Sequence, residues 1–203
     1  MTMNPRRPYF NDLAPRWDTF PVATDAPARI REFLRRSARV GARRILDVGC
    51  GTGILLPYLA EAYPSETVIV EFDLAEAMLR EGVCKFPSGR VLRVCGDAQN
   101  LPFQAASFDL VLCFSVMPHL GDAGLVTQNL FRALRLGGVF TVGHLSASKE
   151  LNEFHHAQNG PIQDDMLLPA RDLGRILCRL GAAVVCAEEG PDSYFVRAER
   201  TNA

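Results

Sequence analysis

The chain of 203 residues carries 22 lysine and arginine residues against 23 aspartate and glutamate residues, a formal net charge of -1. Nucleic-acid-binding proteins use a basic excess to neutralise phosphates, so this balance argues against a nucleic-acid partner. No apolar run approaches the roughly 18 residues that a bilayer span needs, and no signal core follows the N-terminus. With 48% apolar residues, the sequence predicts one soluble domain over residues 1–203 without a membrane partner.

The cysteines are scattered and show no C-x-x-C spacing, which argues against a disulfide framework or a thiolate metal site. They are Cys50, Cys84, Cys95, Cys113, Cys178 and Cys186. We interpret them as reduced thiols, several of them small buried side chains. The sequence therefore predicts a cytoplasmic protein.

Residues 1–25 are rich in proline and aromatic side chains, and Tyr9, Phe10 and Trp17 recur at roughly helical spacing. The segment is expected to pack onto the domain, either as a lid over a ligand or as a plain cover of a sheet edge. Residues 26–39 follow as an amphipathic helix that ends before Gly41. Residues 1–39 thus form an N-terminal lid and helical segment.

A short apolar strand over residues 44–48 leads directly into Gly49, Gly51 and Gly53. Glycines in this position let the backbone turn sharply and approach a ligand without a Cβ in the way. A helix is expected to follow at once, with Ile54 in its apolar stripe and Thr52 as its cap. The pattern predicts a nucleoside-binding turn, although glycine-rich loops also occur as ordinary tight turns.

A carboxylate is needed about 20 residues beyond such glycines, at the end of the next strand, to accept hydrogen bonds from ribose hydroxyls. The β-branched run over residues 67–73 ends in Asp73, and Leu74 and Met78 begin the following helix. Glu71 lies two residues earlier on the same face of the strand and remains the second choice. A third strand, residues 91–95, ends at Asp97, which is placed to accept from an adenine amino group while the Ala98 amide donates to the ring.

The remaining chain continues the alternation of strands and helices, with strands at 108–114 and 139–144, a helix at 122–135 between them, and a helix at 169–180. Strands at 182–187 and 194–198 are joined by Gly190-Pro-Asp-Ser, a hairpin sequence. This order predicts an α/β fold with a Rossmann-like, seven-stranded, mostly parallel sheet, helices on both faces and an antiparallel last strand. Residues 40–145 form the cofactor-binding core, 146–168 a substrate-cover insertion, and 169–203 the C-terminal helix and hairpin.

Five blocks together resemble the class I S-adenosylmethionine-dependent methyltransferases, with core blocks like those of the ubiquinone and menaquinone branch. They are Leu46-Asp-Val-Gly-Cys-Gly-Thr-Gly53, Asp73 with Met78-Leu79, Gly96-Asp-Ala98 with Leu101-Pro-Phe103, Ser107-Phe-Asp-Leu-Val-Leu112, and Leu134-Arg-Leu-Gly-Gly138. The family usually has Gly where Glu71 stands and Pro where Leu136 stands. The blocks cover about half of the chain in the family's order, so the resemblance is specific.

The resemblance implies S-adenosylmethionine as the cofactor and a residue-by-residue contact set. Around the methionine part it places Asp47 and the glycine turn, namely Gly49, Cys50, Gly51 and Gly53. Asp73 is then expected to hold the ribose, and Asp97 and Ala98 to meet the adenine. Leu74, Met78 and Phe114 complete the predicted cofactor contacts.

Three of the four histidines are predicted to converge near the methyl donor, because ligands in open parallel sheets lie at the carboxyl ends of strands. His119 follows the strand at 108–114, His144 closes the strand at 139–144, and His155 lies on a helix expected over residues 148–158. On that helix Leu151, Phe154, His155 and Gln158 should share the inward face.

Three roles for His119, His144 and His155 stay open. One or more could be a catalytic base, because imidazole titrates near neutrality. All three could bind a divalent metal such as zinc, iron, cobalt or nickel, with Asp164 or Asp165 as a further ligand. They could also be structural.

The function predicted is methyl transfer to a small-molecule acceptor through a thiol, oxygen or carbon nucleophile, by a monomer or homodimer. No Asn/Asp-Pro-Pro-Tyr/Phe motif follows residue 114, which counts against enzymes that methylate amino groups of adenine or glutamine. The alternative is a protein that binds S-adenosylmethionine or a metal-loaded ligand without turnover. A nicotinamide oxidoreductase fits the Asp97 block and the Leu136-Gly-Gly138 turn less well.

Overall fold

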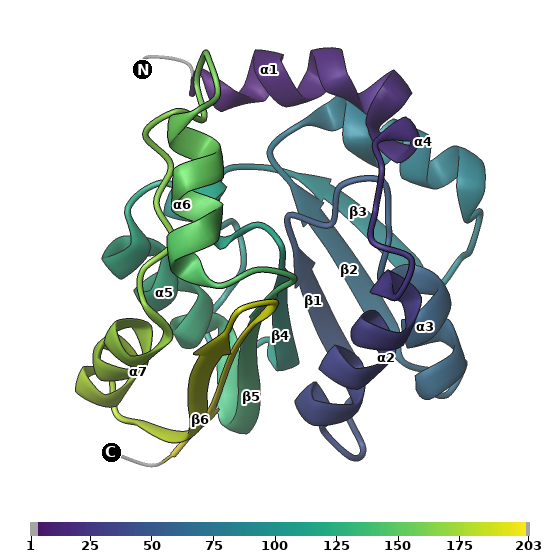
Figure 1. Ribbon diagram of the computed structural model, residues 1–203. Helices are drawn as coiled ribbons and strands as arrows, with labels where there is room; N and C mark the ends of the chain where they lie inside the picture. The colour runs from purple at the N-terminus through teal and green to yellow at the C-terminus, as the bar shows by residue number, and fades with distance from the viewer. Residues whose placement is uncertain (1–3, 202–203) are drawn as a thin grey trace.

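The computed structural model describes residues 4–201 and is built on a seven-stranded sheet in the order β3-β2-β1-β4-β5-β7-β6 (Figure 1). The strands are β1 (Arg44–Val48), β2 (Val68–Asp73), β3 (Val91–Cys95), β4 (Phe108–Phe114), β5 (Leu134–His144), β6 (Ala182–Gly190) and β7 (Ser193–Arg200). The first five pair in parallel, and β7 lies antiparallel between β5 and β6. The predicted fold class is confirmed, including the antiparallel last strand.

Helices cover both faces of this sheet, as the right-handed connections between parallel strands require. They are α1 (Arg6–Leu13), α2 (Ala26–Ser37), α3 (Leu56–Ala62), α4 (Glu76–Lys85), α5 (Ala123–Ala133), α6 (Ser148–His156) and α7 (Ala170–Arg179), with 3-10 turns η1 (Ala14–Thr19), η2 (Ala98–Asn100) and η3 (Met117–Leu120). One face packs against α2 and α3, and the other packs against α5 and α7.

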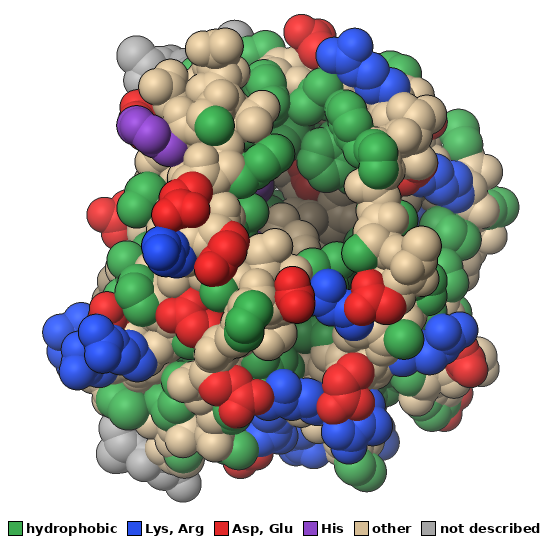
Figure 2. All heavy atoms as spheres, viewed as in Figure 1, with side chains coloured by type: hydrophobic (Ala, Val, Ile, Leu, Met, Phe, Trp, Pro, Cys, Tyr) green, Lys and Arg blue, Asp and Glu red, His purple; other side chains and the backbone are tan. Residues whose placement is uncertain are grey.

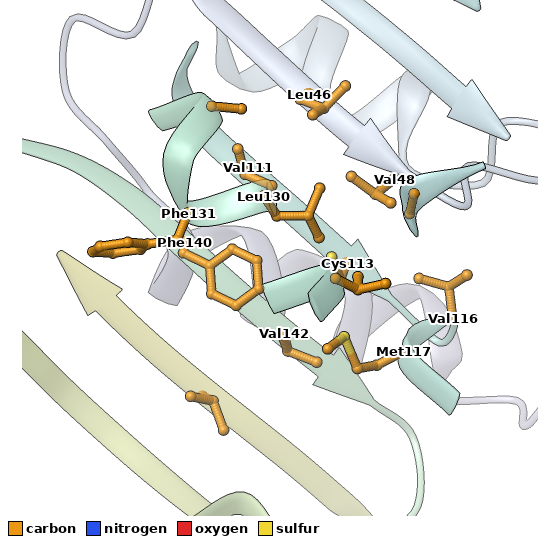
Figure 3. Packing of buried hydrophobic residues seen from close by; sticks show 14 of the residues in the cluster. Leu46, Val48, Val111, Cys113, Val116, Met117, Leu130, Phe131, Phe140 and Val142 are labelled. Carbon is orange, nitrogen blue, oxygen red and sulfur yellow. The ribbon is translucent and has the colours of Figure 1, made fainter. Parts of the chain in front are cut away.

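The larger core lies between the sheet and α5 and α7. Leu46 and Val48 of β1, Val111 and Cys113 of β4, and Phe140 of β5 alternate toward this face and are almost fully buried. Figure 3 shows these side chains meeting Leu130 and Phe131 from α5 and Met117 from η3. Because Met117 follows β4 directly, this core anchors the segment that carries His119.

The helix after the glycine turn begins later than the sequence suggests. Gly51 and Gly53 both have positive φ, so the turn extends to Leu55 before α3 starts at Leu56. Ile54 is consequently 46% exposed rather than inward. Thr52 is not a helix cap, because its hydroxyl donates to Asp18 at 2.7 Å. On α6 the expected inward Phe154 is 56% exposed, whereas His155 is buried.

The N-terminal residues 4–19, here called the strap, run across the carboxyl ends of the strands, where α1 lies along the top of Figure 1. Four polar anchors hold it to separate parts of the domain: Asn4 to Asp97, Arg6 to Asp165, Asn11 to the Ala77 amide, and Asp18 to Thr52 and Lys85. The strap therefore has the placement of a lid; the first three residues of the predicted lid lie outside the described part of the chain.

Within residues 4–201, no helix combines the length and apolar character that crossing a membrane demands.

Candidate functional site

A cavity opens at the carboxyl ends of β1, β2, β3 and β4, beneath the strap. The space between its lining residues, with the open mouth included, is about 610 Å³. Its wall is formed by the turns after these strands and by strap residues such as Phe10 and Trp17. Figure 2 shows this face hollowed at its centre, with hydrophobic side chains on the rim.

The glycine turn forms one side of the cavity through Gly49 and Gly51, both with positive φ. A Cβ on Gly49 would collide with the side chain of Val116, and one on Gly51 would come within 3.7 Å of Trp17 Nε1. The turn is thus packed against the segment after β4 and the strap at the same time. Glycine is needed at Gly49 for backbone conformation and for space.

Asp73 stands at the end of β2 and lines the cavity. Its two carboxylate oxygens accept hydrogen bonds from the backbone amides of Gly51 at 2.9 Å and Ala75 at 2.8 Å. Burial raises the pKa of Asp73, and these backbone donors oppose the rise. Each oxygen keeps a further acceptor site, so a held carboxylate faces the cavity where two ribose hydroxyls would need acceptors.

Glu71, the rival for this role, does not line the cavity. It is 1% exposed and its Oε2 lies 2.7 Å from Arg93 Nε, an ion pair not aligned as a hydrogen bond. Gly53 lies directly over Glu71, since a Cβ there would fall 2.8 Å from Oε1. The structure therefore places Asp73 at the cavity and Glu71 beneath the glycine turn.

The adenine end predicted from the sequence also lies in the cavity wall. Asp97 and Ala98 line it together with Leu74 and Met78. Asp97 Oδ1 accepts from the Gln99 amide at 2.9 Å, which fixes the carboxylate, and Oδ2 accepts from Asn4 Nδ2 at 3.0 Å. A strap residue thus already uses the oxygen that an adenine amino group would approach.

Three predicted cofactor residues are not part of the cavity wall. They are Asp47, at the end of β1, and Cys50 and Gly53, within the glycine turn. Asp47 is 2% exposed, and burial together with the charge of Glu71 raises its pKa strongly. Its Oδ2 has no hydrogen-bond partner among the described residues. An unpartnered buried carboxylate oxygen is costly, so a donor in the ligand or an ordered water would stabilise it.

The sequence predicts a cofactor contact for Phe114, but this residue does not line the cavity. Its side chain points to the opposite face of the sheet, where its ring packs 4.9 Å from that of Phe33 on α2. The physical reason is strand periodicity, because Phe114 shares its face with Leu110 and Leu112. Phe114 is a core residue under α2.

Replacement of Phe114 by Leu should therefore destabilise the fold by about 1 kcal/mol and leave the affinity for S-adenosylhomocysteine unchanged. Chemical denaturation and calorimetric titration would measure the two quantities separately. A weaker cofactor affinity in a variant of wild-type stability would return Phe114 to the cofactor set.

His119 lies on η3, directly after β4, and lines the cavity. Its Nδ1 is 2.6 Å from Asp165 Oδ2, so Nδ1–H donates and Nε2 keeps its lone pair in the neutral ring. Arg6 Nε donates to the same carboxylate at 2.8 and 3.1 Å. Burial alone would raise the pKa of Asp165, but the hydrogen bonds from His119 and Arg6 outweigh it and lower that pKa. A carboxylate that remains charged thus orients the imidazole toward the cavity.

His155 packs against both His119 and Asp165. It is 2% exposed, its Nδ1–H donates to the Asp165 carbonyl at 3.0 Å, and its ring lies 4.8 Å from that of His119. Burial and the neighbouring His119 lower the pKa of His155. The side chain does not line the cavity, so the structure gives it contact with His119 and Asp165 rather than with a ligand.

His144 at the end of β5 is buried away from the cavity wall, with its ring 5.6 Å from that of Tyr194. Its Nε2 has no partner among the described residues. Burial, with smaller effects of His119 and His155, lowers the pKa of His144 to about 3. The side chain is therefore a neutral core group, and the structure does not support a catalytic role for it.

This pKa makes a testable contribution to stability. Between pH about 3 and 6.5 the unfolded chain protonates His144 whereas the native state does not, so the unfolding free energy falls as pH is lowered, by up to about 1.4 kcal/mol per pH unit. His144→Leu should reduce that slope between about pH 4 and 6, measured by urea denaturation at a series of pH values. An unchanged slope would mean that His144 protonates in the native state.

The predicted metal site is not supported. Within residues 4–201, no group of three His, Cys, Asp or Glu side chains is arranged to hold a metal ion. The physical reason is that the Asp165 carboxylate is taken by Arg6 and His119, while His155 is turned to a backbone carbonyl. A guanidinium occupies the place where a cation would be needed.

The sequence does not predict that Arg6, His119 and Asp165 lie together. It predicts Asp165 only as one of two possible further metal ligands, and Arg6 belongs to no recognisable motif. The two are 159 residues apart in the chain, so no local pattern could connect them.

The sequence is similar to those of known methyltransferases. The methyltransferase-domain family matches residues 45–138. A malonyl-[acyl-carrier protein] O-methyltransferase of Laribacter hongkongensis is 32% identical over 69% of this chain and 50% of its own length. A ubiquinone/menaquinone biosynthesis C-methyltransferase of Syntrophotalea carbinolica is 32% identical over 65% of this chain and 57% of its own. The chain spans about half the length of the curated relatives it matches.

Solved structures extend the similarity to the whole fold. A chain of the complex between the Haloferax volcanii Trm112 methyltransferase activator and a methyltransferase superposes with a TM-score of 0.82 at 15% identity, over 97% of this chain and 98% of that one. The [4+2]-cyclase SpnF gives 0.76 at 15% identity over 100% and 98%. Haemonchus contortus phosphoethanolamine N-methyltransferase 2, in complex with S-adenosyl-L-methionine, gives 0.69 at 17% identity over 86% and 53%.

A parallel sheet with an antiparallel final strand, and a cavity between its glycine turn and the acids that end β2 and β3, define the nucleoside-binding fold of methyltransferases. The methyltransferase-domain family matches the chain over these same turns. Together with the similar methyltransferases, this match confirms the resemblance to the class I S-adenosylmethionine-dependent methyltransferases recognised in the sequence.

Proposed function

We propose that this protein binds S-adenosylmethionine in the cavity under the strap and transfers the methyl group to a small-molecule acceptor, with His119 as the base. The observation that carries the proposal is the Asp165–His119 pair, whose 2.6 Å hydrogen bond leaves Nε2 available at the cavity. The bound cofactor would supply an electrophilic methyl group on a sulfonium.

The residues that would hold the cofactor follow from the cavity wall. Asp73 would accept from the ribose and Asp97 from the adenine, and the turn at Gly49 and Gly51 would lie against the remainder, since all four residues line the cavity. Asp47 lies behind that turn with an unpartnered oxygen, and it would accept, directly or through water, from the ammonium of the methionine part. These contacts fix the donor so that an acceptor can be held in line with it, which is the main requirement of methyl transfer.

His119 would remove the proton from an acceptor that must ionise before it attacks. Asp165 fixes the tautomer and stabilises the imidazolium as it forms, as carboxylates do for catalytic histidines. Arg6 offsets the charge of Asp165, and His155 is a positioning residue that packs behind the pair. The segment 146–168, which contributes His155 and Asp165, then acts as the substrate cover of a unit formed by residues 1–203.

The alternative is binding of S-adenosylmethionine without methyl transfer. It is supported by the superposition on SpnF, which is a [4+2]-cyclase, because one fold hosts different reactions. The acceptors named for the relatives, a malonyl thioester of a carrier protein and quinone precursors, belong to those longer proteins.

Calorimetry with S-adenosylhomocysteine, followed by measurement of its release from S-adenosylmethionine in the presence of small nucleophiles, tests the proposal. We expect one binding site per chain and acceptor-dependent release. Tight binding with no release above the acceptor-free background would favour the alternative. That the protein is a monomer or homodimer and that it is cytoplasmic stay predictions. Light scattering coupled to gel filtration would measure the oligomeric state.

A further inference from the structure

We propose that the methyl acceptor is an uncharged, largely apolar molecule that carries a weakly acidic hydroxyl or thiol, and that it is not a carboxylate. This inference rests on the proposed function and narrows its acceptor class. It departs from the relatives that are named malonyl-[acyl-carrier protein] O-methyltransferases.

The first support is the charge of the cavity wall. Among the described residues that line it there are two carboxylates, Asp73 and Asp97, and no lysine or arginine. Arg6 and Arg7 of the strap lie outside this wall, and the Arg6 guanidinium donates to Asp165. An anionic acceptor would therefore meet carboxylates and no cationic side chain in the wall itself, and like charges placed together cost several kcal/mol.

The second support is that His119 is already held in the orientation of a general base. A carboxylate is already ionised at neutral pH and needs no proton acceptor, whereas a hydroxyl or thiol becomes a strong nucleophile as its proton leaves. The His119 imidazole has its Nδ1 fixed by Asp165, which is 1% exposed. A buried, charge-compensated carboxylate is costly to maintain, and an acceptor without a transferable proton would make no use of it.

The third support is the surface beside the base. Phe10 of the strap lies 5.3 Å from the His119 ring in an edge-to-face arrangement, and Val116 and Leu120 flank it in the cavity wall. These side chains offer apolar contact and no polar partner for a charged group. An ammonium acceptor would find no unpaired carboxylate beside His119, because Arg6 already balances the charge of Asp165.

The step balances without a further reactant. The acceptor's oxygen–hydrogen or sulfur–hydrogen proton passes to His119 Nε2, and the electron pair left behind forms the bond to the methyl carbon. The carbon–sulfur bond breaks with its electrons returning to sulfur, so the sulfonium becomes a neutral thioether. The imidazolium then loses its proton to solvent after the methylated product leaves.

A matched acceptor series tests the inference on the full chain. Phenylmethanethiol, phenol, benzoate and benzylamine each carry one benzene ring and differ in the reacting group, and the thiol and the phenol are both uncharged at neutral pH. S-adenosylhomocysteine release would be measured with each at equal concentration. We expect the thiol or the phenol to exceed benzoate and benzylamine at least 100-fold in kcat/KM. Preferred turnover of benzoate or benzylamine would overturn the inference and leave methyl transfer standing. No turnover of any member, with S-adenosylhomocysteine bound, would count against the proposed function itself.

A second arm separates a base from a packing residue. A nitro-substituted benzenethiol is ionised at neutral pH and phenol is not, so His119→Gln should lose at least 100-fold in kcat with phenol and only a few-fold with the nitro compound. His156→Gln, which alters the exposed neighbour of His155, is the control and should match wild type with both. Equal losses on both acceptors would show that His119 acts by packing alone, which would remove the second support and contradict the inference.

Discussion

Replacement of His119 by Gln should lower kcat for an acceptor that is not ionised by roughly 10² to 10⁴-fold, the usual contribution of a positioned base. Glutamine keeps much of the volume and can still meet Asp165, so the fold and the affinity for S-adenosylhomocysteine should change little. The reason for the loss is specific, since Nε2 is the nitrogen left facing the cavity once Nδ1 is bound to Asp165. Stopped-time measurement of S-adenosylhomocysteine and calorimetry would give the rate and the affinity.

The pH profile provides a readout that a structural role would not move. The rate of the His119→Gln variant should rise with pH in step with ionisation of the acceptor in solution, whereas the wild-type rate should not follow that ionisation, because His119 removes the acceptor's proton within the site. His156→Gln, at an exposed position on α6, should retain the wild-type profile. Parallel profiles for wild type and His119→Gln would remove His119 from the reaction.

Replacement of Asp73 by Ala should weaken S-adenosylhomocysteine binding by roughly 1.5–3 kcal/mol, or about 10- to 150-fold in Kd. The loss has two parts, because Asp73 presents acceptor sites to the ribose and also holds the amides of Gly51 and Ala75 in place. Calorimetric titration measures it directly. Since the amides are part of the effect, Asp73→Asn should recover some affinity through its carbonyl oxygen.

Glu71→Gln is the matched control for Asp73→Ala, because Glu71 lies two residues earlier on the same strand, β2. It should reduce stability, because Arg93 then lacks its buried partner, and leave the affinity of the folded protein unchanged. If Glu71→Gln weakens S-adenosylhomocysteine binding and Asp73→Ala does not, Glu71 is the carboxylate that binds the ribose. The cofactor would then lie in another position than the one proposed.

The fold could be predicted closely because its signals are local. The run that ends at Val48, the glycine turn and the alternation of strands and helices each follow from neighbouring residues. The placement of Asp73 and Asp97 at one cavity also follows, since the carboxyl ends of parallel strands meet at one edge. Those residues were placed by topology rather than by any contact that the sequence displays.

The site beyond the cofactor was less predictable because it depends on contacts between distant segments. Both His119 and His144 follow strand ends, yet η3 turns His119 toward the cavity while His144 stays in the sheet and packs on Tyr194. Phe114 lies on the α2 face with Leu112, as strand alternation dictates, whereas the family resemblance alone implied a cofactor contact. The pairing of Arg6 with Asp165 has no sequence pattern at all.

The strap joins the two ends of the reaction in one piece of chain. Asn4 is bonded to the carboxylate at the adenine end, and Arg6, two residues later, to the carboxylate that orients the base. Because only Pro5 separates Asn4 from Arg6, a shift of this short segment would act on both carboxylates at once. The adenine end of the cavity and the acid beside His119 are therefore mechanically linked through three consecutive residues of the strap.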